Sequence, residues 1–390
     1  MKVYIIGGGC GGSEMMTGKA YTAINRCEVI IGPERMINLP FVNKKVFKEY
    51  KAENIKQIID CENKDTAVIM GGDSGFYSGT KKLLELLKGY DTEVIPGISS
   101  ISYFAAKLKL NWENWKISSL HGMKNNIIGY VKENKYTFII LSGSDDIKDI
   151  CNKLILYKMD YVTLYVGENL SYDDERIERG TAASISKMSF KKLAVMLIVN
   201  EKAEKSYGLI PDDEFIRGKV PMTKAEIRSV SLLKLGLRSN AVFYDVGSGT
   251  GSVAVSAALL DPEIKVYAIE KKKEALELIG LNKIKFAVDN LDIIEGKAPD
   301  VLEYLPSPTH VFIGGSDGNT KEIIDCVREK NKNVKIVINT VTMETLCEVK
   351  KYTEEHSIAA EFVQINSSRG ENMGKYTLMK ASNPVYIISF

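Results

Sequence analysis

Short runs of apolar, β-branched and aromatic residues recur along the chain, and most are followed by a turn and then by a segment with helical spacing. The run Val3–Ile6 leads into GGGCGGSE, and the run Val242–Val246 leads into GSGTGS. Strands that alternate with amphipathic helices predict parallel sheets whose loops gather at the carboxyl ends of the strands. The pattern therefore indicates an α/β fold with two separate glycine-rich loops.

The same pattern predicts individual elements. In the first part we expect strands at Lys2–Ile6, Glu28–Ile31, Thr66–Met70 and Glu93–Ile95, and helices at Ser13–Asn25, Thr80–Leu87 and Ile101–Leu108. After a hinge at Asn111–Lys116, strands are expected at Thr137–Leu141, Tyr161–Val166 and Ala194–Val199. In the last part we expect a helix at Lys224–Leu235 and strands at Lys265–Ile269, Lys285–Val288, His310–Ile313, Lys335–Asn339, Glu361–Ile365 and Val385–Phe390.

The length of 390 residues is long for a single core and comfortable for two or three domains. The stretch Glu201–Phe215 is polar and carries a glycine and a proline, as a linker does. We therefore expect one domain over residues 1–205, with half-domains at about 1–110 and 111–205, and a second domain over 206–390.

Composition narrows the class of protein. Lys and Arg number 52 against 50 Asp and Glu, which is too balanced for a dedicated nucleic-acid binder. No apolar run approaches the ~20 residues of a membrane helix, and the amino terminus shows no signal peptide. The six cysteines form no CxxC pair, and with three histidines we expect no metal site. These features predict a cytoplasmic protein with reduced cysteines and no membrane or nucleic-acid partner.

The second glycine-rich loop carries a specific signal. Asp245 ends a strand, glycines follow at Gly247, Gly249 and Gly251, and Glu270 ends the next strand. An acid at that place can accept both hydroxyls of a ribose. This spacing is typical of S-adenosylmethionine methyltransferases, and a nucleotide loop of an oxidoreductase is the alternative. The absence of a GxxxxGK[ST] lysine argues against a triphosphate site.

The loop after the fourth strand constrains the methyl acceptor. Strand His310–Ile313 leads into Gly314-Gly315-Ser316, without the (N/D)PPY-like loop of amine-directed nucleic-acid methyltransferases. The similar Asn383–Tyr386 lies at the last strand, which is the wrong place. Carbon or oxygen methylation of a small molecule remains.

Residues 206–390 resemble the decarboxylating C15-methyltransferases of the cobalamin pathway. The motifs that carry the likeness are KVPMTKAEIRSVSLLKL, VFYDVGSGTGSV, VYAIEKKKEALELI, HVFIGGSDGN, NTVTMETL and NPVYIIS. The chain departs from the family at Lys297, where EGKAP replaces EGDAP. The resemblance implies that S-adenosylmethionine contacts Thr223, Gly247, Ser248, Gly249, Thr250, Gly251, Glu270 and Ala298.

The first glycine-rich loop allows two interpretations. Gly7, Gly9 and Gly12 satisfy GxGxxG, but the acid that a dinucleotide needs after the second strand comes late, at Glu34. The loops GGDSGFYSG, PGISS and GENLSYDDERI instead resemble the tetrapyrrole methyltransferases of the cobalamin pathway, which hold folded S-adenosylmethionine between two half-domains. Cys10 and Gly12 depart from the family's GPGDPE. The resemblance implies cofactor contacts by Gly72, Asp73, Phe76, Tyr77, Pro96, Ser99, Ser100, Ser142 and Glu168.

The two resemblances together imply a fused enzyme of the cobalamin pathway. It would methylate a corrin precursor, precorrin-6B or its cobalt form, at C5 and C15 and decarboxylate the C12 acetate, with S-adenosylmethionine at two sites. Asp73, His121 and Arg369 are the candidate catalytic residues, and Lys219, Lys224 and Arg369 are candidates for holding substrate carboxylates. We also expect a homo-oligomer. The alternatives are a methyltransferase of another substrate class, such as tRNA, and a non-catalytic binding module.

Overall fold

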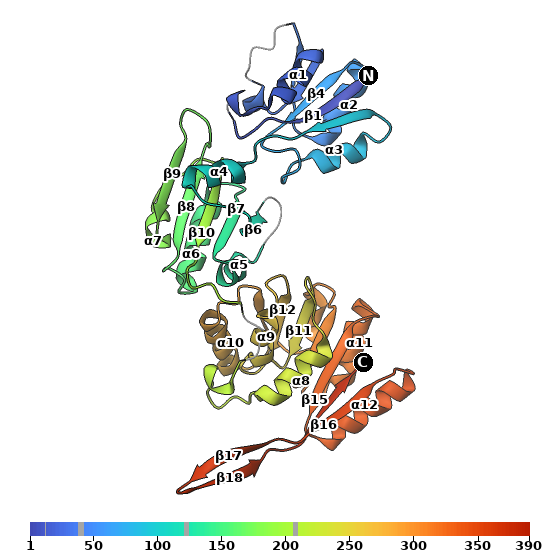
Figure 1. The fold of residues 1–390 in the computed structure, drawn as a ribbon. Helices are drawn as coiled ribbons and strands as arrows, with labels where there is room; N and C mark the ends of the chain where they lie inside the picture. Colours follow the sequence, from blue (N-terminus) through green and yellow to red (C-terminus); the bar gives the residue numbers. More distant parts are fainter. Residues whose placement is uncertain (12, 38–42, 121–124, 206–209) are drawn as a thin grey trace. The chain divides into compact units, whose positions relative to one another are not determined.

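Figure 1 shows the computed structural model of the chain, which describes residues 1–11, 13–37, 43–120, 125–205 and 210–390. The chain divides into two compact units. Unit 1 contains Met1–Lys124, Lys135–Ile155 and Asp160–Glu201, and unit 2 contains Asn125–Asn134, Leu156–Met159 and Lys202–Phe390. Both units combine helices with β-sheets, which confirms the predicted α/β class.

Unit 1 holds two five-stranded sheets, and the first is parallel throughout, in the order β3-β2-β4-β1-β5. Its central strands are apolar and buried along their length, as expected for a parallel sheet covered on both faces. The strands are β1 (Lys2–Gly7), β2 (Val29–Gly32), β3 (Lys45–Lys48), β4 (Thr66–Met70) and β5 (Asp91–Ile95). The helices are α1 (Gly18–Arg26), α2 (Ala52–Glu62) and α3 (Thr80–Leu86), with short 3-10 helices η1 (Ser13–Met15) and η2 (Glu34–Met36).

The second sheet of unit 1 is mixed, in the order β6-β7-β10-β8-β9. Only β6 and β7 run parallel, and the other neighbours are antiparallel. Phe104, Trp115 and Phe138 form its aromatic core. The elements are α4 (Ser100–Leu108), β6 (Lys116–Ser119), β7 (Tyr136–Ile140), α6 (Asp145–Leu156), β8 (Thr163–Glu168), β9 (Arg176–Gly180), α7 (Ala182–Ile185) and β10 (Ala194–Val199), and α5 (Ile127–Glu133) is grouped with unit 2.

Unit 2 is built on a seven-stranded sheet in the order β13-β12-β11-β14-β15-β19-β16. The first five strands are parallel, and β19 is antiparallel to both of its neighbours. The strands are β11 (Val242–Val246), β12 (Lys265–Glu270), β13 (Leu291–Glu295), β14 (His310–Ile313), β15 (Lys335–Thr340), β16 (Glu361–Ile365) and β19 (Val385–Ser389). The helices are α8 (Ala225–Leu235), α9 (Ser252–Ala258), α10 (Lys273–Lys285), α11 (Thr320–Lys330) and α12 (Met343–Glu355), with η3 (Asp212–Glu214) and η4 (Asp300–Tyr304).

A two-stranded hairpin extends away from the sheet of unit 2, drawn in dark red in Figure 1. It consists of β17 (Ser368–Met373) and β18 (Tyr376–Ala381), and every residue of both strands is exposed. The sequence pattern missed this hairpin, and Arg369 lies on its first strand, β17. The reason is that neither strand has a buried face, so no alternation of apolar and polar residues marks it.

Two other predicted elements differ from the structure. The strand predicted at Lys285–Val288 is wrong, because Lys285 ends α10 and Phe286 packs against Phe215 just after the helix end. The strand at this place is β13, at Leu291–Glu295. The helix predicted from Ser13 begins only at Gly18, where the Thr17 side chain accepts a hydrogen bond from the backbone of Ala20 and caps the helix.

Candidate functional site

Unit 1 contains a cavity of ≈ 660 Å³ that is lined by both of its sheets. The first sheet contributes the loops that follow β1 and β4, and the second contributes β7, β10 and the loop after β8. The carboxyl ends of parallel strands are where α/β proteins bind ligands, because loops converge there. The cavity is therefore the candidate ligand site of unit 1.

The backbones of three glycines meet at this edge of the first sheet, and two of them, Gly7 and Gly97, have no room for a Cβ. A Cβ on Gly97 would lie 2.5 Å from the carbonyl oxygens of both Gly7 and Gly72. The loop after β1 is also held to the loop after β4 by paired hydrogen bonds between Gly9 and Gly72, of 3.0 and 2.7 Å. These glycines bring three strand-end loops into direct contact and so form one wall of the site.

This arrangement argues against the dinucleotide interpretation of the first glycine-rich loop. In that motif the glycines open a helix whose amino terminus faces a pyrophosphate. Here the next α-helix begins only at Gly18, after the short η1. Gly12, the last glycine of the pattern, lies outside the described residues.

Asp73 accepts hydrogen bonds from its own loop, after β4, and from the loop after β5, and so holds the two loops together. One of its carboxylate oxygens accepts a hydrogen bond from the Gly75 backbone at 2.8 Å, and the other accepts one from the Gly97 backbone at 2.9 Å. Because both oxygens are engaged by the protein, the carboxylate shapes the cavity wall. This use differs from the free acid or base that a candidate catalytic role implies.

The predicted contacts of the first domain divide into those that line the cavity and those that do not. Ser99 caps α4, and Glu168 is buried where it pairs with Arg176 at 2.9 Å and accepts from the Lys191 backbone at 2.7 Å. Pro96 likewise does not line the cavity, and His121 lies outside the described residues. The predicted residues that do line it are Gly72, Asp73, Phe76, Tyr77, Ser100 and Ser142.

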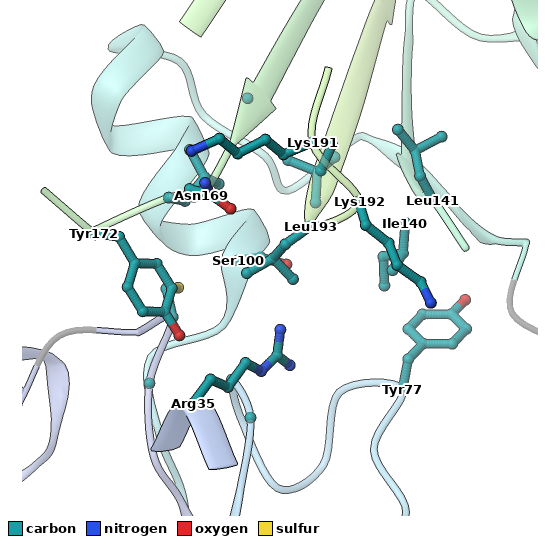
Figure 2. A pocket seen from close by; sticks show the side chains of 18 of the residues that line it. Arg35, Tyr77, Ser100, Ile140, Leu141, Asn169, Tyr172, Lys191, Lys192 and Leu193 are labelled. Carbon is teal, nitrogen blue, oxygen red and sulfur yellow. The ribbon is translucent and has the colours of Figure 1, made fainter. Parts of the chain in front are cut away.

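Tyr77 has a strained backbone at the mouth of this cavity. Its φ of 47° lies in the left-handed region, which is costly for an aromatic residue. Its ring is edge-on to Phe76 at a centroid distance of 5.2 Å and is 58% exposed. Figure 2 shows the Tyr77 ring at the edge of the cavity, with the Lys192 amine directed toward it.

Sequence reasoning missed the polar and charged side chains Arg35, Tyr172, Lys191 and Lys192 of the cavity. Figure 2 shows Arg35 and the Tyr172 hydroxyl directed inward from one side and the Lys192 amine directed toward the Tyr77 ring. Burial raises the pKa of the Tyr172 hydroxyl, and the charge of Arg35 partly offsets this effect. Tyr172 lies within the GENLSYDDERI motif, which does not single it out, and Arg35, Lys191 and Lys192 lie in segments that carry no motif.

Unit 2 contains a second cavity of ≈ 620 Å³ at the carboxyl ends of its parallel strands. The loops after β11 through β15 contribute to it, and the segment Val220–Lys224 covers one side. Predicted residues that line it are Thr223, Lys224, Gly247, Ser248, Gly249, Glu270 and Ala298.

The glycine loop of this cavity has a left-handed backbone conformation that favours glycine. Gly249 has φ +59°, and a Cβ there would lie 2.9 Å from the Pro221 carbonyl oxygen. A Cβ on Gly247 would lie 2.5 Å from the carbonyl oxygen of Gly315, in the loop after β14. Side chains at Gly247 and Gly249 would therefore displace neighbouring backbone, which explains why glycine stands at both positions.

Glu270 holds the loop while its carboxylate stays at the cavity surface. One oxygen accepts from the Gly249 backbone at 2.9 Å, and the other accepts from the backbones of Lys271 and Lys272 at 2.8 and 3.0 Å. A carboxylate has about four acceptor positions, and three are occupied here, so one remains for a ribose hydroxyl. The glycine loop and this acid fit an adenosine cofactor.

Asp245 lies completely buried at the end of β11. Its Oδ2 accepts from the Ser248 hydroxyl at 2.6 Å and from the Ala254 backbone at 3.0 Å, whereas its buried Oδ1 has no hydrogen bond among the described residues. Burial raises the pKa of this carboxyl to about 7, against the lowering effect of the two hydrogen bonds. Asp245 thus links Ser248 of the glycine loop to Ala254 of α9.

Two buried polar side chains anchor the segment that covers the second cavity. Arg228 donates to the carbonyl oxygen of Thr223 at 2.8 Å and to that of Ile210, and it pairs with Asp212 at 3.3 Å. Asn282 donates to the carbonyl oxygens of Ile216 and Thr250, both at 2.9 Å. The path of the chain before and through Thr223 is thereby fixed.

The remaining predicted residues of the second domain do not line its cavity. Arg369 pairs with Asp212 at 2.8 Å and with Glu226 at 2.7 Å, which ties β17 to the body of the unit. Thr250 is buried beneath the loop, Gly251 begins α9, and Lys219 precedes the covering segment. Lys297, the departure from the family motif, does line the cavity and lies 4.0 Å from Asp317.

Two findings limit the kinds of site that the described residues can form. Within the described ranges no group of three His, Cys, Asp or Glu side chains is arranged to hold a metal ion. Over the same ranges, no helix combines the length and the apolar character that crossing a bilayer demands.

Comparison with known proteins agrees with this two-part organisation. Residues 2–186 match the family model described as Tetrapyrrole (Corrin/Porphyrin) Methylases, and residues 214–390 match the Precorrin methyltransferase domain. The probable cobalt-precorrin-6B C(15)-methyltransferase (decarboxylating) of Pyrobaculum calidifontis is 45% identical over 183 residues, 46% of this chain and 94% of that protein. The precorrin-6Y C(5,15)-methyltransferase [decarboxylating] of a Sinorhizobium species is 25% identical over 341 residues, 85% of this chain and 81% of that protein.

A solved structure from Geobacter metallireducens, described as precorrin-6Y C5,15-methyltransferase, is 38% identical to the chain. It covers 46% of this chain and 94% of its own, with a TM-score of 0.44. The two family matches and the two cavities define a two-part, S-adenosylmethionine-dependent methyltransferase. The chain belongs to the family of decarboxylating precorrin C5,15-methyltransferases.

The close contact of Gly97 with Gly7 and Gly72 predicts that two alanine variants of unit 1 differ sharply in stability. Gly97→Ala should destabilise the unit by about 1–3 kcal/mol, because the new Cβ overlaps two backbone oxygens that cannot move independently. Gly79→Ala is the matched control, since nothing lies within 4 Å of a Cβ there, and should change stability by less than about 0.5 kcal/mol. Thermal unfolding measures both, and equal stability of the two variants would contradict this close contact.

The pKa of Asp245 predicts a pH-dependent stability of unit 2. Because the pKa rises from 3.8 to about 7 on folding, the folded state keeps a proton in this window that the unfolded state releases. The free energy of unfolding should therefore fall as the pH rises through the window, and Asp245→Asn should flatten the dependence. Thermal unfolding from about pH 4 to about pH 8 tests this, and the same slope in both proteins would speak against it.

Proposed function

We propose that the chain methylates a precorrin-6-type tetrapyrrole at C5 in unit 1 and at C15 in unit 2, with decarboxylation of an acetate side chain. The observation that supports this most strongly is the presence of two separate cavities. The second lies inside the precorrin methyltransferase match, and the first is lined by residues of the tetrapyrrole methylase match together with Lys191–Val195 just beyond it. We place one S-adenosylmethionine in each cavity. The functional division is residues 1–205, with half-domains at about 1–110 and 111–205, and residues 206–390.

S-adenosylmethionine supplies an electrophilic methyl group, so an electron-rich ring carbon needs no strong base to react. The residues of unit 1 then act mainly by positioning and by excluding water. Gly72 and Ser100 present backbone and hydroxyl groups to the donor, while Phe76 and Tyr77 form an apolar wall beside it. Asp73 keeps these loops in register through its two backbone hydrogen bonds.

In unit 2 the glycine loop and Glu270 hold the donor, and the segment Val220–Lys224 covers it. Ala298 borders the adenine, and Thr223 contacts the donor from the covering segment. Loss of CO2 leaves an electron pair that the conjugated macrocycle can accept, so the protein needs to hold the ring rather than supply a separate electron sink. C15 methylation and decarboxylation share this cavity.

Cationic side chains near the second cavity suit the carboxylates of the substrate. Lys224 lines the cavity directly and is the residue we assign to this role first. Lys219 comes just before the covering segment and lies outside the cavity lining. Arg369 is engaged by two carboxylates of the protein, so we assign it to positioning the hairpin.

We also propose that the chain forms a homo-oligomer through its hairpin. Met373, Tyr376, Leu378 and Met379 are each more than half exposed there, at 62%, 76%, 53% and 69%. A two-stranded hairpin is marginally stable in water by itself. The hairpin of a second copy would cover these side chains.

Loss of the second site alone should leave C5 methylation intact. Gly249→Ala places a Cβ 2.9 Å from the Pro221 carbonyl oxygen in a left-handed backbone, so the donor is displaced and the C15 step should fall on the order of 100-fold. Gly236→Ala carries similar strain, at φ +62° and away from the cavity, and should keep both steps. Mass spectrometry of the product, with and without cobalt in the substrate, counts methyl additions and CO2 loss. Loss of both methylations in Gly249→Ala would overturn the two-site assignment.

The reciprocal variant tests the first site. Asp73→Asn turns one acceptor into a donor that faces a backbone N–H, so the two loops that Asp73 holds together should separate and C5 methylation should fall on the order of 100-fold. The C15 step and decarboxylation should persist. Asp65→Asn is the control, because Asp65 also accepts a backbone hydrogen bond, from Lys2 at 2.7 Å, but does not line the cavity. Unchanged C5 methylation in Asp73→Asn would refute its role.

A further inference from the structure

Two cations face the cavity of unit 1, and neither pairs with a charged side chain among the described residues. Arg35 follows β2 in η2, and Lys192 precedes β10, so they come from the two different sheets of the unit. Neither side chain has an ion pair or a hydrogen bond to any residue in the part of the chain that the structure describes. Figure 2 shows both terminal groups directed into the cavity.

The chain leaves space for Arg35 at this position. A Cβ added to Gly71 would lie 2.9 Å from the Arg35 Nη2 atom, so the guanidinium lies directly over the backbone of Gly71. Gly71 precedes Gly72 and Asp73 in the loop after β4, which we assign to donor binding. Because Gly71 has no side chain, the Arg35 guanidinium can lie beside this loop.

The other charged side chains that line the cavity are one lysine and two aspartates, so three cations stand against two anions. Lys191 pairs with Asp174, and Asp73 is held by the backbone N–H groups of Gly75 and Gly97. Arg35 and Lys192 therefore leave the cavity lining with an excess of positive charge. A ligand that meets both cations should carry more than one negative group.

The donor does not match this charge. S-adenosylmethionine carries a sulfonium, an ammonium and a single carboxylate, so it is a net cation. The tetrapyrrole of the proposed function is a polycarboxylate. We propose that Arg35 and Lys192 form a subsite in unit 1 that binds carboxylate side chains of the macrocycle. This inference rests on the proposed function.

The test compares Arg35→Gln, Lys192→Gln and the double variant in the full chain. Each single change should raise KM for the tetrapyrrole in C5 methylation about 10-fold, with kcat nearly unchanged, because a charge-assisted contact is lost in the ground state and the transition state alike. The C15 step in the same chain is an internal control and should not change. Lys148→Gln removes an exposed charge of α6 outside the cavity and should behave as wild type.

Gly71→Ala gives a second variant that keeps Arg35 in the chain. Its Cβ displaces the guanidinium, so KM for the tetrapyrrole should rise in the same direction as in Arg35→Gln. The donor also carries a carboxylate, which these cations can bind as they would a carboxylate of the macrocycle. Calorimetric titration with S-adenosylhomocysteine in the absence of tetrapyrrole therefore shows whether the cations bind the donor. A weaker donor Kd with unchanged tetrapyrrole KM in Arg35→Gln and Lys192→Gln would overturn the proposal, as would no effect on either.

A binding measurement without turnover separates this proposal from the proposed function. Uroporphyrin, a porphyrin whose side chains are all carboxylates, is titrated against the full chain and followed by its fluorescence. The double variant should bind it about 100-fold more weakly at one of its sites. If the wild-type chain methylates no tetrapyrrole, the proposed function is refuted. If the wild type and the double variant bind uroporphyrin equally, the proposed subsite is refuted.

Discussion

In both units the loops that follow the central strands meet at glycines, where a Cβ would overlap a neighbouring backbone. Gly97 meets Gly7 and Gly72 in unit 1, and Gly247 meets Gly315 in unit 2. These close approaches fix the position of the strand-end loops, and each cavity lies against the loops that are fixed in this way. The two glycine-rich motifs therefore share a physical role, although one joins three loops of a five-stranded sheet and the other opens a helix.

Carboxylates near these close glycine contacts accept backbone hydrogen bonds and so hold the loops in place. Asp73 accepts two backbone hydrogen bonds in unit 1, and Glu270 accepts three in unit 2. Asp245 holds the glycine loop from the buried side at the cost of a raised pKa. A methyl donor that is already activated requires geometry more than acid–base chemistry, and the placement of these side chains matches that requirement.

The sequence predicts features that depend on local pattern. Buried parallel strands, the turn glycines and Glu270 follow from apolar runs and spacing, and the structure has these strands within one or two residues of the expected bounds. Arg369 could not be placed, because its ion pairs join residues far apart in the chain. Arg35 and Lys192 escaped notice for the same reason, since two loops without a motif meet only after folding. The strand predicted at Lys285–Val288 failed because apolar residues at a helix end have the same appearance as a short buried strand.

The central claim is that one chain carries two independent sites for the methyl donor. The most direct measurement is the stoichiometry of S-adenosylhomocysteine binding to the intact chain by isothermal titration calorimetry. We predict two equivalents per chain, with one equivalent lost when Gly249 is replaced. A single equivalent bound by the unaltered chain would contradict the claim.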